Sequence, residues 1–546
     1  MPATIRLGFP FASAFASAWL MACPPFPEQD TCGDGCMSTS LPGTSGPLLP
    51  TTSVGDGGFQ TVTGAEESTS TSGPGPGGTT GEEWAEPPEI VKVELTPNPI
   101  LMNGSIDVEV SAQHADGVLM VLEGGVEIQL ESGQPGQFEG HFDVITGLDN
   151  GEHKALFTPW RDADVHGKEV MALYTIDLPT PGSQILWETS DALGPGEVVA
   201  LGVLPDGQVV EFGTHFPKGA PRCYLRRRDK KGVSNSVTFI LENSDCTAVD
   251  MKIDADGALF VLVSRKGGDG VRWWYGKSAG WGKGAINLGT GELGETAVAL
   301  ARHPSGKVAV CGYAPTPSTD VDAMVEIFEP EVPEGTKLRF DYKPEKEGPH
   351  TVYERSRDCV FTGDTLALVG EANGKHDLDI IKRDRLFILR VDDDGNSKWN
   401  VPKPEVKTQS GAQAVDVDDD GNLVVAGFSC DDICVPEGDL GVYDSNELLK
   451  WKVSLGGFKS KDVATKDLVW SPAGYAVVAT GGLKDAETLF TVRAFNDMQV
   501  PPLWTFTHKD IKQLNFALAL VIGPYGEVYA GGMGEDGYPA VAFIGG

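Results

Sequence analysis

The amino-acid sequence predicts an all-β fold in which a β-sandwich is followed by a β-propeller. Three observations support this prediction. Short runs of alternating apolar and polar residues, typical of strands, recur from residue 88 onward. Turns rich in Gly, Pro and Asn-Gly separate these runs. In the C-terminal two thirds a longer unit repeats, and its period is typical of a propeller blade. The 546 residues are enough for two or three domains.

The repeat occupies residues 183–546, and each copy contains an apolar run, a small turn and a second apolar run. A glycine stands in every turn, where a tight hairpin needs a residue that tolerates positive φ. These glycines are Gly207, Gly257, Gly306, Gly363, Gly421, Gly474 and Gly526. Their spacings are 50, 49, 57, 58, 53 and 52 residues, which defines seven copies of one hairpin.

A second, weaker hairpin lies between copies, and in three of them it carries a tryptophan: Trp399, Trp451 and Trp504. Each copy then has four antiparallel strands, A to D, and seven copies make a seven-bladed β-propeller. Six or eight blades stay open if one degenerate unit is miscounted. A lone strand at 183–191 precedes the first copy, whereas the last copy lacks strand D. We expect this first strand to complete the last blade and close the ring, which hides the sheet edges.

Residues 88–182 contain about seven short strand-like runs, a pattern that fits a β-sandwich. The segment resembles bacterial immunoglobulin-like domains. No aligned Cys–Trp–Cys set is present, so the resemblance rests on the strand pattern and implies a fold, not an activity.

The N-terminus has the features of an export signal. Arg6 is the only charge ahead of the apolar run LGFPFASAFASAWLMA, which has the length of a signal peptide. The run ends in Leu20-Met21-Ala22-Cys23, which resembles the lipobox of bacterial lipoproteins. The resemblance implies removal of residues 1–22 and a diacylglycerol on Cys23, which would anchor the chain to a membrane. Pro24, where an aspartate would resemble a retention signal, favours the outer membrane, on its periplasmic side or the cell surface. An ordinary secretion signal with an incidental cysteine is the alternative.

Residues 23–87 form the next predicted segment, a disordered linker. Residues 24–87 have no lysine or arginine and are dense in Gly, Ser, Thr and Pro, so they cannot bury enough apolar surface to fold. The whole chain has a formal net charge of −35, which argues against nucleic acid as a partner. We expect a monomer held to the membrane through its lipid.

Eight cysteines remain besides Cys23, and an even number in an exported chain indicates disulfides more than zinc. The candidates are Cys32, Cys36, Cys223, Cys246, Cys311, Cys359, Cys430 and Cys434. We expect the last six on the propeller face that carries the long B–C and D–A loops. The pairings 223–246, 311–359 and 430–434 suit this placement.

Three aspartates at alternate positions, Asp416, Asp418 and Asp420, begin like a calcium loop. The twelfth position of such a loop should be a chelating carboxylate, but here it is Gly427, inside an apolar run. Other copies place Pro-Asp-Gly or Pro-Ser-Gly in the same turn. The aspartates are therefore weak metal candidates in a hairpin turn, and no cofactor or catalytic residue is predicted.

Two further motifs are interpreted as structural features and not as catalytic or binding sites. Residues 276–280 match the Gly-x-Ser-x-Gly pattern of a nucleophile elbow, yet no helix is expected to follow them. Arg226, Arg227 and Arg228 form a basic cluster, which we interpret as a solvated strand and turn, with contact to an anionic polymer as the alternative.

The hairpin from Val391 to Trp399 resembles the Asp…Gly-x-x-x-Trp unit of quinoprotein-like, WD40-like propellers. That group includes quinone-dependent dehydrogenases and non-enzymatic envelope lipoproteins, and the resemblance covers the architecture without a cofactor site. Our first hypothesis is a non-catalytic, lipid-anchored binding or scaffold protein, with a protein or polysaccharide partner on the long-loop face. The alternatives are a quinoprotein-like oxidoreductase or carbohydrate-active enzyme that uses the channel, and an envelope-assembly factor that docks partners by β-augmentation.

Overall fold

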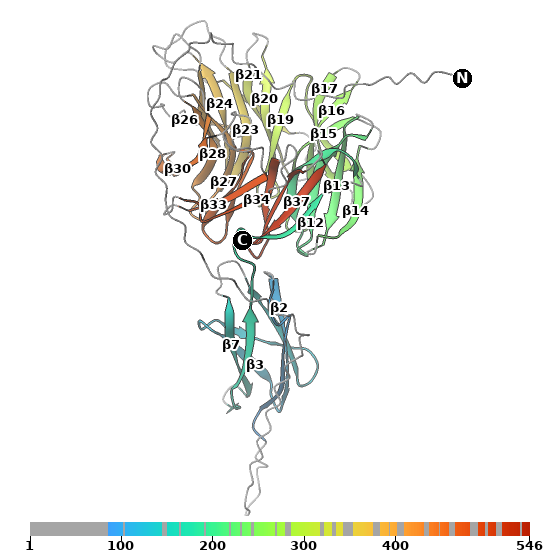
Figure 1. Cartoon of the computed structure of the whole chain (residues 1–546), viewed down its shortest axis with the longest axis vertical. Coiled ribbons are helices and arrows are strands. Elements are labelled where there is room, and N and C mark those ends of the chain that lie inside the picture. The colour runs from blue at the N-terminus through green and yellow to red at the C-terminus, as the bar shows by residue number, and fades with distance from the viewer. Residues whose placement is uncertain are drawn as a thin grey trace, which may run out of the picture. The chain divides into compact units, whose positions relative to one another are not determined.

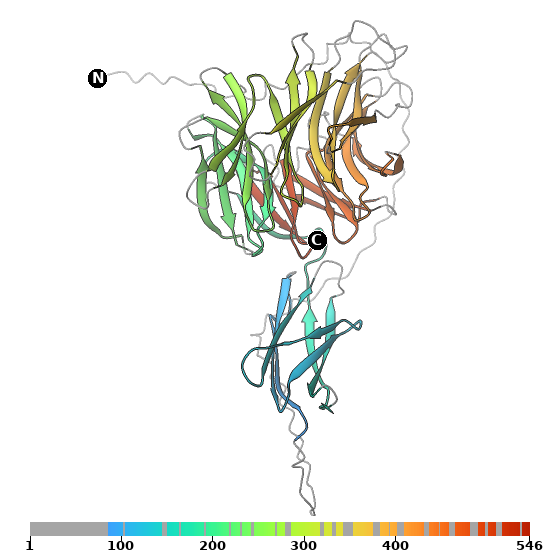
Figure 2. The same cartoon turned by 180° about the vertical axis from the view of Figure 1, so that it is seen from behind.

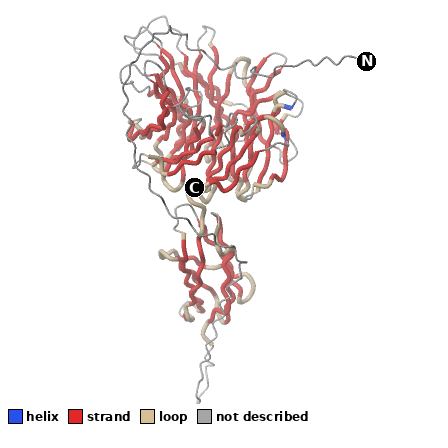
Figure 3. Tube along the Cα trace, in the orientation of Figure 1, coloured by secondary structure: helices blue, strands red, loops and turns tan. Residues whose placement is uncertain are grey.

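The computed structural model describes residues 86–545 with gaps, and those residues form strands joined by turns (Figure 3). The gaps are 102–103, 145–149, 163–164, 190–192, 218–219, 230–231, 242–244, 268–269, 279–284, 317–320, 330–334, 342–352, 375–382, 393, 401–408, 431–435, 447, 458–464, 481–489, 497–500, 509–515 and 535–537. Within the described ranges no helix has the length and apolar character to cross a membrane.

The first strands form two antiparallel sheets that share one core. One sheet has the order β1 (Glu89–Thr96), β2 (Gly104–Gln113), β6 (Gln137–Val144) and β5 (Glu131–Ser132). The other has the order β4 (Glu127–Gln129), β3 (Gly117–Leu122), β7 (Gly151–Arg161) and β8 (Val165–His166), with β9 (Val170–Ile176) also on β7. Ile106, Val108 and Val110 alternate with polar residues on β2 and lie in the core. The alternation explains why this segment forms a two-layer structure.

Between residues 184 and 544 the described strands fall into seven groups of four, which we call units. The first two are β11 (Gly196–Val203), β12 (Val209–His215), β13 (Arg222–Arg228) and β14 (Ser234–Ile240), then β15 (Cys246–Ile253), β16 (Leu259–Gly267), β17 (Gly270–Ser278) and β18 (Ala285–Thr290). The next two are β19 (Thr296–Arg302), β20 (Val308–Pro315), β21 (Val321–Phe328) and β22 (Thr336–Phe340), then β23 (Tyr353–Thr362), β24 (Thr365–Gly374), β25 (Arg383–Val391) and β26 (Ser397–Asn400). One parallel residue pair, Val321 with Tyr353, joins units three and four into a single sheet.

The last three units complete the series. They are β27 (Gln409–Val417), β28 (Leu423–Cys430), β29 (Pro436–Tyr443) and β30 (Leu449–Gly457); β31 (Asp467–Ser471), β32 (Tyr475–Thr480), β33 (Phe490–Phe495) and β34 (Trp504–His508); and β35 (Phe516–Ile522), β36 (Val528–Met533) and β37 (Pro539–Ile544) with β10 (Gln184–Thr189). β10 pairs antiparallel with β37. The strand that precedes the first unit therefore belongs to the last one, as the sequence predicts.

The units close into a ring. We call the first strand of each unit its inner strand: β11, β15, β19, β23, β27, β31 and β35. Each inner strand contacts the next, and β35 contacts β11. Figures 1 and 2 show the result from two sides, with the red β37 beside the green strands of the first unit. The fold is propeller-like, and the inner strands surround its centre.

Glycines occupy the A–B turn of every unit and, in most units, a second position opposite a bulge of the inner strand. The seven predicted turn glycines all have positive φ, between 56° and 94°, so each A–B hairpin closes where the sequence places it. A register shift interrupts the pairing of six of the seven inner strands as described, and in all of these but β15 a glycine of the second strand lies opposite. At one of these, Gly427, a Cβ would lie 2.1 Å from the carbonyl oxygen of Gly411. The bulge therefore requires glycine there.

Two expectations about the strands are wrong. Arg226 and Arg228 are 4% and 1% exposed, not solvated, because alternation along β13 turns them inward, where both form ion pairs with the buried Glu211. Only Arg227 of this cluster faces outward, to Asp206. Cys311 and Cys359 lie inside β20 and β23, not at the long-loop rim, and both are buried.

Candidate functional site

Five charged side chains gather at the centre of the ring: Asp250, Lys252, Asp358, Asp416 and Asp467. We call them the central cluster. They come from β15, β23, β27 and β31, and all four carboxylates interact electrostatically with the Lys252 ammonium. Lys252 Nζ lies 3.5 Å from an oxygen of Asp250, and the two side chains are 42% and 15% exposed. The cluster is deep in the fold yet keeps contact with solvent.

Each aspartate of the cluster is held by two backbone N–H groups. One oxygen accepts from the following residue on the same strand, at 2.7–2.9 Å. The other oxygen accepts from the inner strand of the next unit. These donors are Leu300 to Asp250 at 2.7 Å, Val415 to Asp358 at 2.8 Å, Trp470 to Asp416 at 2.6 Å and Leu520 to Asp467 at 2.6 Å. The aspartate side chains therefore connect neighbouring units through hydrogen bonds, which are charge-assisted when the carboxyl is ionised.

Three of these aspartates follow a rule in the sequence that local motif searches miss. The rule concerns the residue seven positions before the turn glycine. In the fourth copy, which has a shorter turn, it is the residue five positions before. This residue alternates between alanine and aspartate around the ring. The series reads Ala200, Asp250, Ala299, Asp358, Ala414, Asp467 and Ala519. The alanines are buried, and each aspartate binds the N–H that directly follows the alanine of the next unit. A small residue there leaves room for the neighbouring carboxylate.

Burial raises the pKa of three carboxyls of the cluster, Asp358, Asp416 and Asp467. Burial raises the pKa of Asp358 to about 8, although Lys252 and the Val415 N–H oppose the rise. Burial likewise raises the pKa of Asp467 to about 7, against the Leu520 N–H and Lys252. Burial also raises the pKa of Asp416. For Lys252, burial alone would lower the pKa, but the attraction of the four carboxylates outweighs it and raises the pKa. The cluster thus exchanges protons near neutral pH.

A pocket of about 500 Å³ opens beside the cluster, at the end of the ring where the A–B turns lie. We call it the mouth pocket. Its walls are mostly aliphatic, with Leu204, Ile253 and Ile522 among them, and its charged wall residues are Lys252 and Asp254. No aromatic ring is among its described lining residues. The volume and the wall chemistry suit a small aliphatic group better than a sugar, which stacks on aromatic rings.

The three weak metal candidates have separate roles. Asp418 caps its hairpin turn, where its carboxylate accepts from the backbone N–H groups of Asp420 and Asn422 at 3.0 and 2.8 Å. Asp420 is an exposed turn residue, whereas Asp416 belongs to the central cluster. The structure does not bring the three together as a ligand set.

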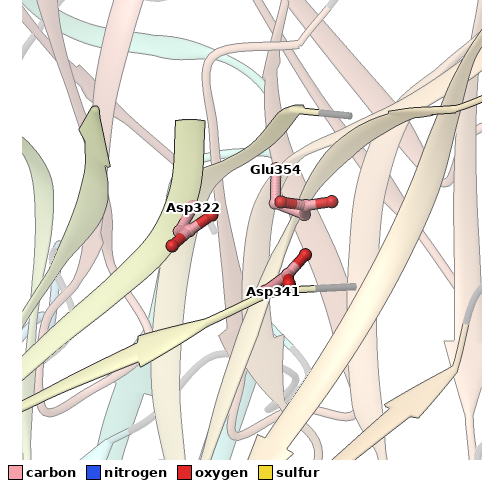
Figure 4. Close-up of side chains that lie close together, drawn as sticks. All are labelled: Asp322, Asp341 and Glu354. Carbon is pink, nitrogen blue, oxygen red and sulfur yellow. The ribbon is translucent and has the colours of Figure 1, made fainter. Parts of the chain in front are cut away.

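A different acidic group lies between the third and fourth units. One carboxylate oxygen from each of Asp322, Asp341 and Glu354 falls within 4.8 Å of the others, and Figure 4 shows the three side chains facing one another. They come from the start of β21, the residue after β22 and the start of β23. Hard cations such as Ca²⁺ take oxygen ligands of this kind. Each of the three also interacts with other groups of the chain.

The cysteines divide into three sets. Cys223 pairs with Cys246, and Cys311 pairs with Cys359, with Cα separations of 5.6 and 6.4 Å. Cys430 is buried at the end of β28, and its expected partner Cys434 lies outside the described residues. Cys23, Cys32 and Cys36 also lie outside the described residues, as do the lipobox and the linker.

Comparison with known proteins gives distant structural likeness only. No protein-family model and no curated protein matches the sequence. Among solved structures, the polysaccharide lyase Uly1 is similar over 67% of this chain and 93% of its own, with 10% identity and a TM-score of 0.43. A putative oxidoreductase (glucose dehydrogenase) from Thermus thermophilus is similar over 54% and 96%, with 14% identity and a TM-score of 0.33. A protein of unknown function from Dyadobacter fermentans matches over 67% and 100%, with 12% identity and a TM-score of 0.40. None of these likenesses bears on activity.

Proposed function

We propose that the chain is a non-catalytic binding protein of the bacterial outer membrane, anchored through a lipid on Cys23. In this proposal an immunoglobulin-like sandwich carries a seven-bladed β-propeller, and the mouth pocket receives an aliphatic group of the partner. The proposal rests on two features that occur together. The mouth pocket has aliphatic walls. The central carboxylates beside it accept hydrogen bonds from the next unit. A protein partner with an exposed aliphatic side chain fits this pocket. The long-loop face stays a second contact surface in the proposal.

The enzyme alternative has one observation in its favour. Carboxyls with a raised pKa beside a pocket are common in active sites, and Asp358 and Asp467 have this property. Against it, each of these side chains already accepts two backbone N–H groups, one of them from the next unit, so both of its oxygens have a structural role. A structural role explains the same geometry without a substrate.

Binding in the mouth pocket can be tested with a substitution that fills the pocket with a large side chain. Ala255→Trp places a large ring at an exposed lining position. Ala473→Trp makes the same change at an exposed turn residue of the sixth unit that does not line the pocket. We expect a titration with 1-hexanol to shift the methyl NMR signals of Met251, Ile253 and Ile522 in the parent and in A473W, but not in A255W. Equal shifts in both variants, or no shift in the parent, would contradict binding in this pocket.

The anchor is tested at the N-terminus. Mass spectrometry of the mature protein from its membrane fraction should give a chain that begins at Cys23 and carries a diacylglycerol, and Cys23→Ala should abolish this modification. Two acyl chains hold a protein firmly because each buried CH₂ contributes about 0.8 kcal/mol. An unmodified mature N-terminus would remove the anchoring part of the proposal and leave the pocket untouched.

A further inference from the structure

We propose that the central cluster is a proton-sensitive clasp that sets how tightly the units of the ring hold together. Aspartates on units two, four, five and six each tie their unit to the next, and the Lys252 ammonium offsets part of their negative charge when they ionise. The inference goes beyond partner binding, since it concerns the ring itself.

The hydrogen bonds of the clasp cross four of the seven junctions between units. Asp250, Asp358 and Asp467 tie unit two to three, four to five and six to seven. Asp416 ties unit five to unit six. It stands two residues after Ala414, the alanine of its own unit in the alternating series. Lys252 stands two residues after Asp250 and thus at the level of Asp416. Because several units share one cation, a change of charge at the centre reaches all of them.

The other charged groups on the inner strands have partners of their own. Arg302 lies 3.7 Å from Asp254, and Arg357 forms an ion pair with Glu371. Glu197 interacts electrostatically with Lys466 at the start of the sixth unit. Glu354 belongs to the acidic group near β21, and Arg355 lies over the rings of Tyr313 and Tyr353. Lys252 is therefore the cation that serves the central carboxylates.

Stability should fall as pH rises, because folding raises the pKa of Asp358 and of Asp467. The folded-state pKa of Asp358 and of Asp467, about 8 and about 7, lies above the value of 3.8 in an unfolded chain. Their contribution to stability is then complete below the unfolded pKa and is lost as pH rises through the folded pKa. The free energy of unfolding therefore falls from about pH 4 upward and levels off at about pH 8, where both carboxyls are ionised in the folded ring and repel each other.

The test combines titration with variants of the mature full chain. In ¹³C NMR, two aspartate carboxyl signals should titrate with midpoints of about 8 and about 7, and Asp358→Asn and Asp467→Asn should each remove one. The thermal midpoint of the ring should fall by several degrees between about pH 5 and about pH 8.5, and Lys252→Met should enlarge this fall. Lys452→Met, which removes a half-exposed lysine paired with Asp439 on outer strands, should leave the fall unchanged.

Chemical rescue distinguishes the contribution of the Lys252 charge from the contribution of its side-chain volume. In Lys252→Ala, butylammonium should restore the midpoint at about pH 8.5 more than the isosteric alcohol 1-butanol does, because only the former brings a cation. Three results would overturn the clasp: aspartates that all titrate below about pH 5, a K252M loss that is equal at both pH values, or equal rescue by the two compounds. If K252M does not fold, the carboxyl titration of the parent protein still tests the clasp, because it measures the pKa values of the central aspartates directly.

Discussion

Single residues explain how a strongly acidic chain keeps charges in its interior. Arg226 and Arg228 are buried beside Glu211, which is 0% exposed and forms ion pairs with both. On the same face of β12, Val209 packs in one cluster with Val541 of β37. The charged group thus lies where the first unit meets the last, the place at which the ring closes.

Removal of Glu211 should be costly. Glu211→Ala leaves two buried guanidinium groups without their shared carboxylate, and breaking a buried pair in this way costs roughly 3 kcal/mol. Glu437→Ala, at an exposed position of β29, is the control and should change the free energy of unfolding by less than about 0.5 kcal/mol. Denaturant unfolding followed by tryptophan fluorescence measures both, and similar losses for the two variants would contradict the role assigned to Glu211.

At the scale of the element, the A–B hairpin is the part of the fold that the sequence predicts best. Its seven turn glycines and two apolar runs are local features, so a period of about 50 residues reveals them and the structure confirms their turns. The burial of Arg226 could not be read from the cluster of three arginines alone, because it depends on Glu211 from the neighbouring strand. By contrast, the expected pairings of Cys223 with Cys246 and of Cys311 with Cys359 agree with the two disulfides of the structure, although Cys311 and Cys359 lie inside strands and not at the rim.

The glycine opposite the bulge of the fifth unit, Gly427, is a requirement at the scale of the element. In Gly427→Ala the new methyl would lie 2.1 Å from a backbone oxygen, so the inner strand must move and the free energy of unfolding should fall by roughly 2 kcal/mol or more. Gly441→Ala is the matched control on β29, since its Cβ first meets the flexible side chain of Leu449 at 3.1 Å. A loss in G441A as large as that in G427A would show that the bulge does not need glycine.

At the scale of the whole molecule, periodicity indicates a closed ring, and the pairing of β10 with β37 agrees with it. Of the central cluster only Asp416 lies in a local motif, and that motif suggests a metal loop, not the group at the centre of the ring. Asp358 and Asp467 stand out only when all seven copies are aligned on their turn glycines. The mouth pocket could not be predicted either, since its walls come from the first, second, sixth and seventh units.

The centre of this ring, in our proposal, is structural, and the protein binds without catalysis. The most direct measurement is a turnover assay of the mature full chain, with quinone, Ca²⁺ and sugar or alcohol substrates followed by dye reduction, and with anionic polysaccharides followed by new chain ends. We predict no turnover above that of a heat-denatured sample in either format. Turnover that is present in the parent and lost in the D358N/D467N double variant would contradict the proposal and assign the central carboxylates to an active site.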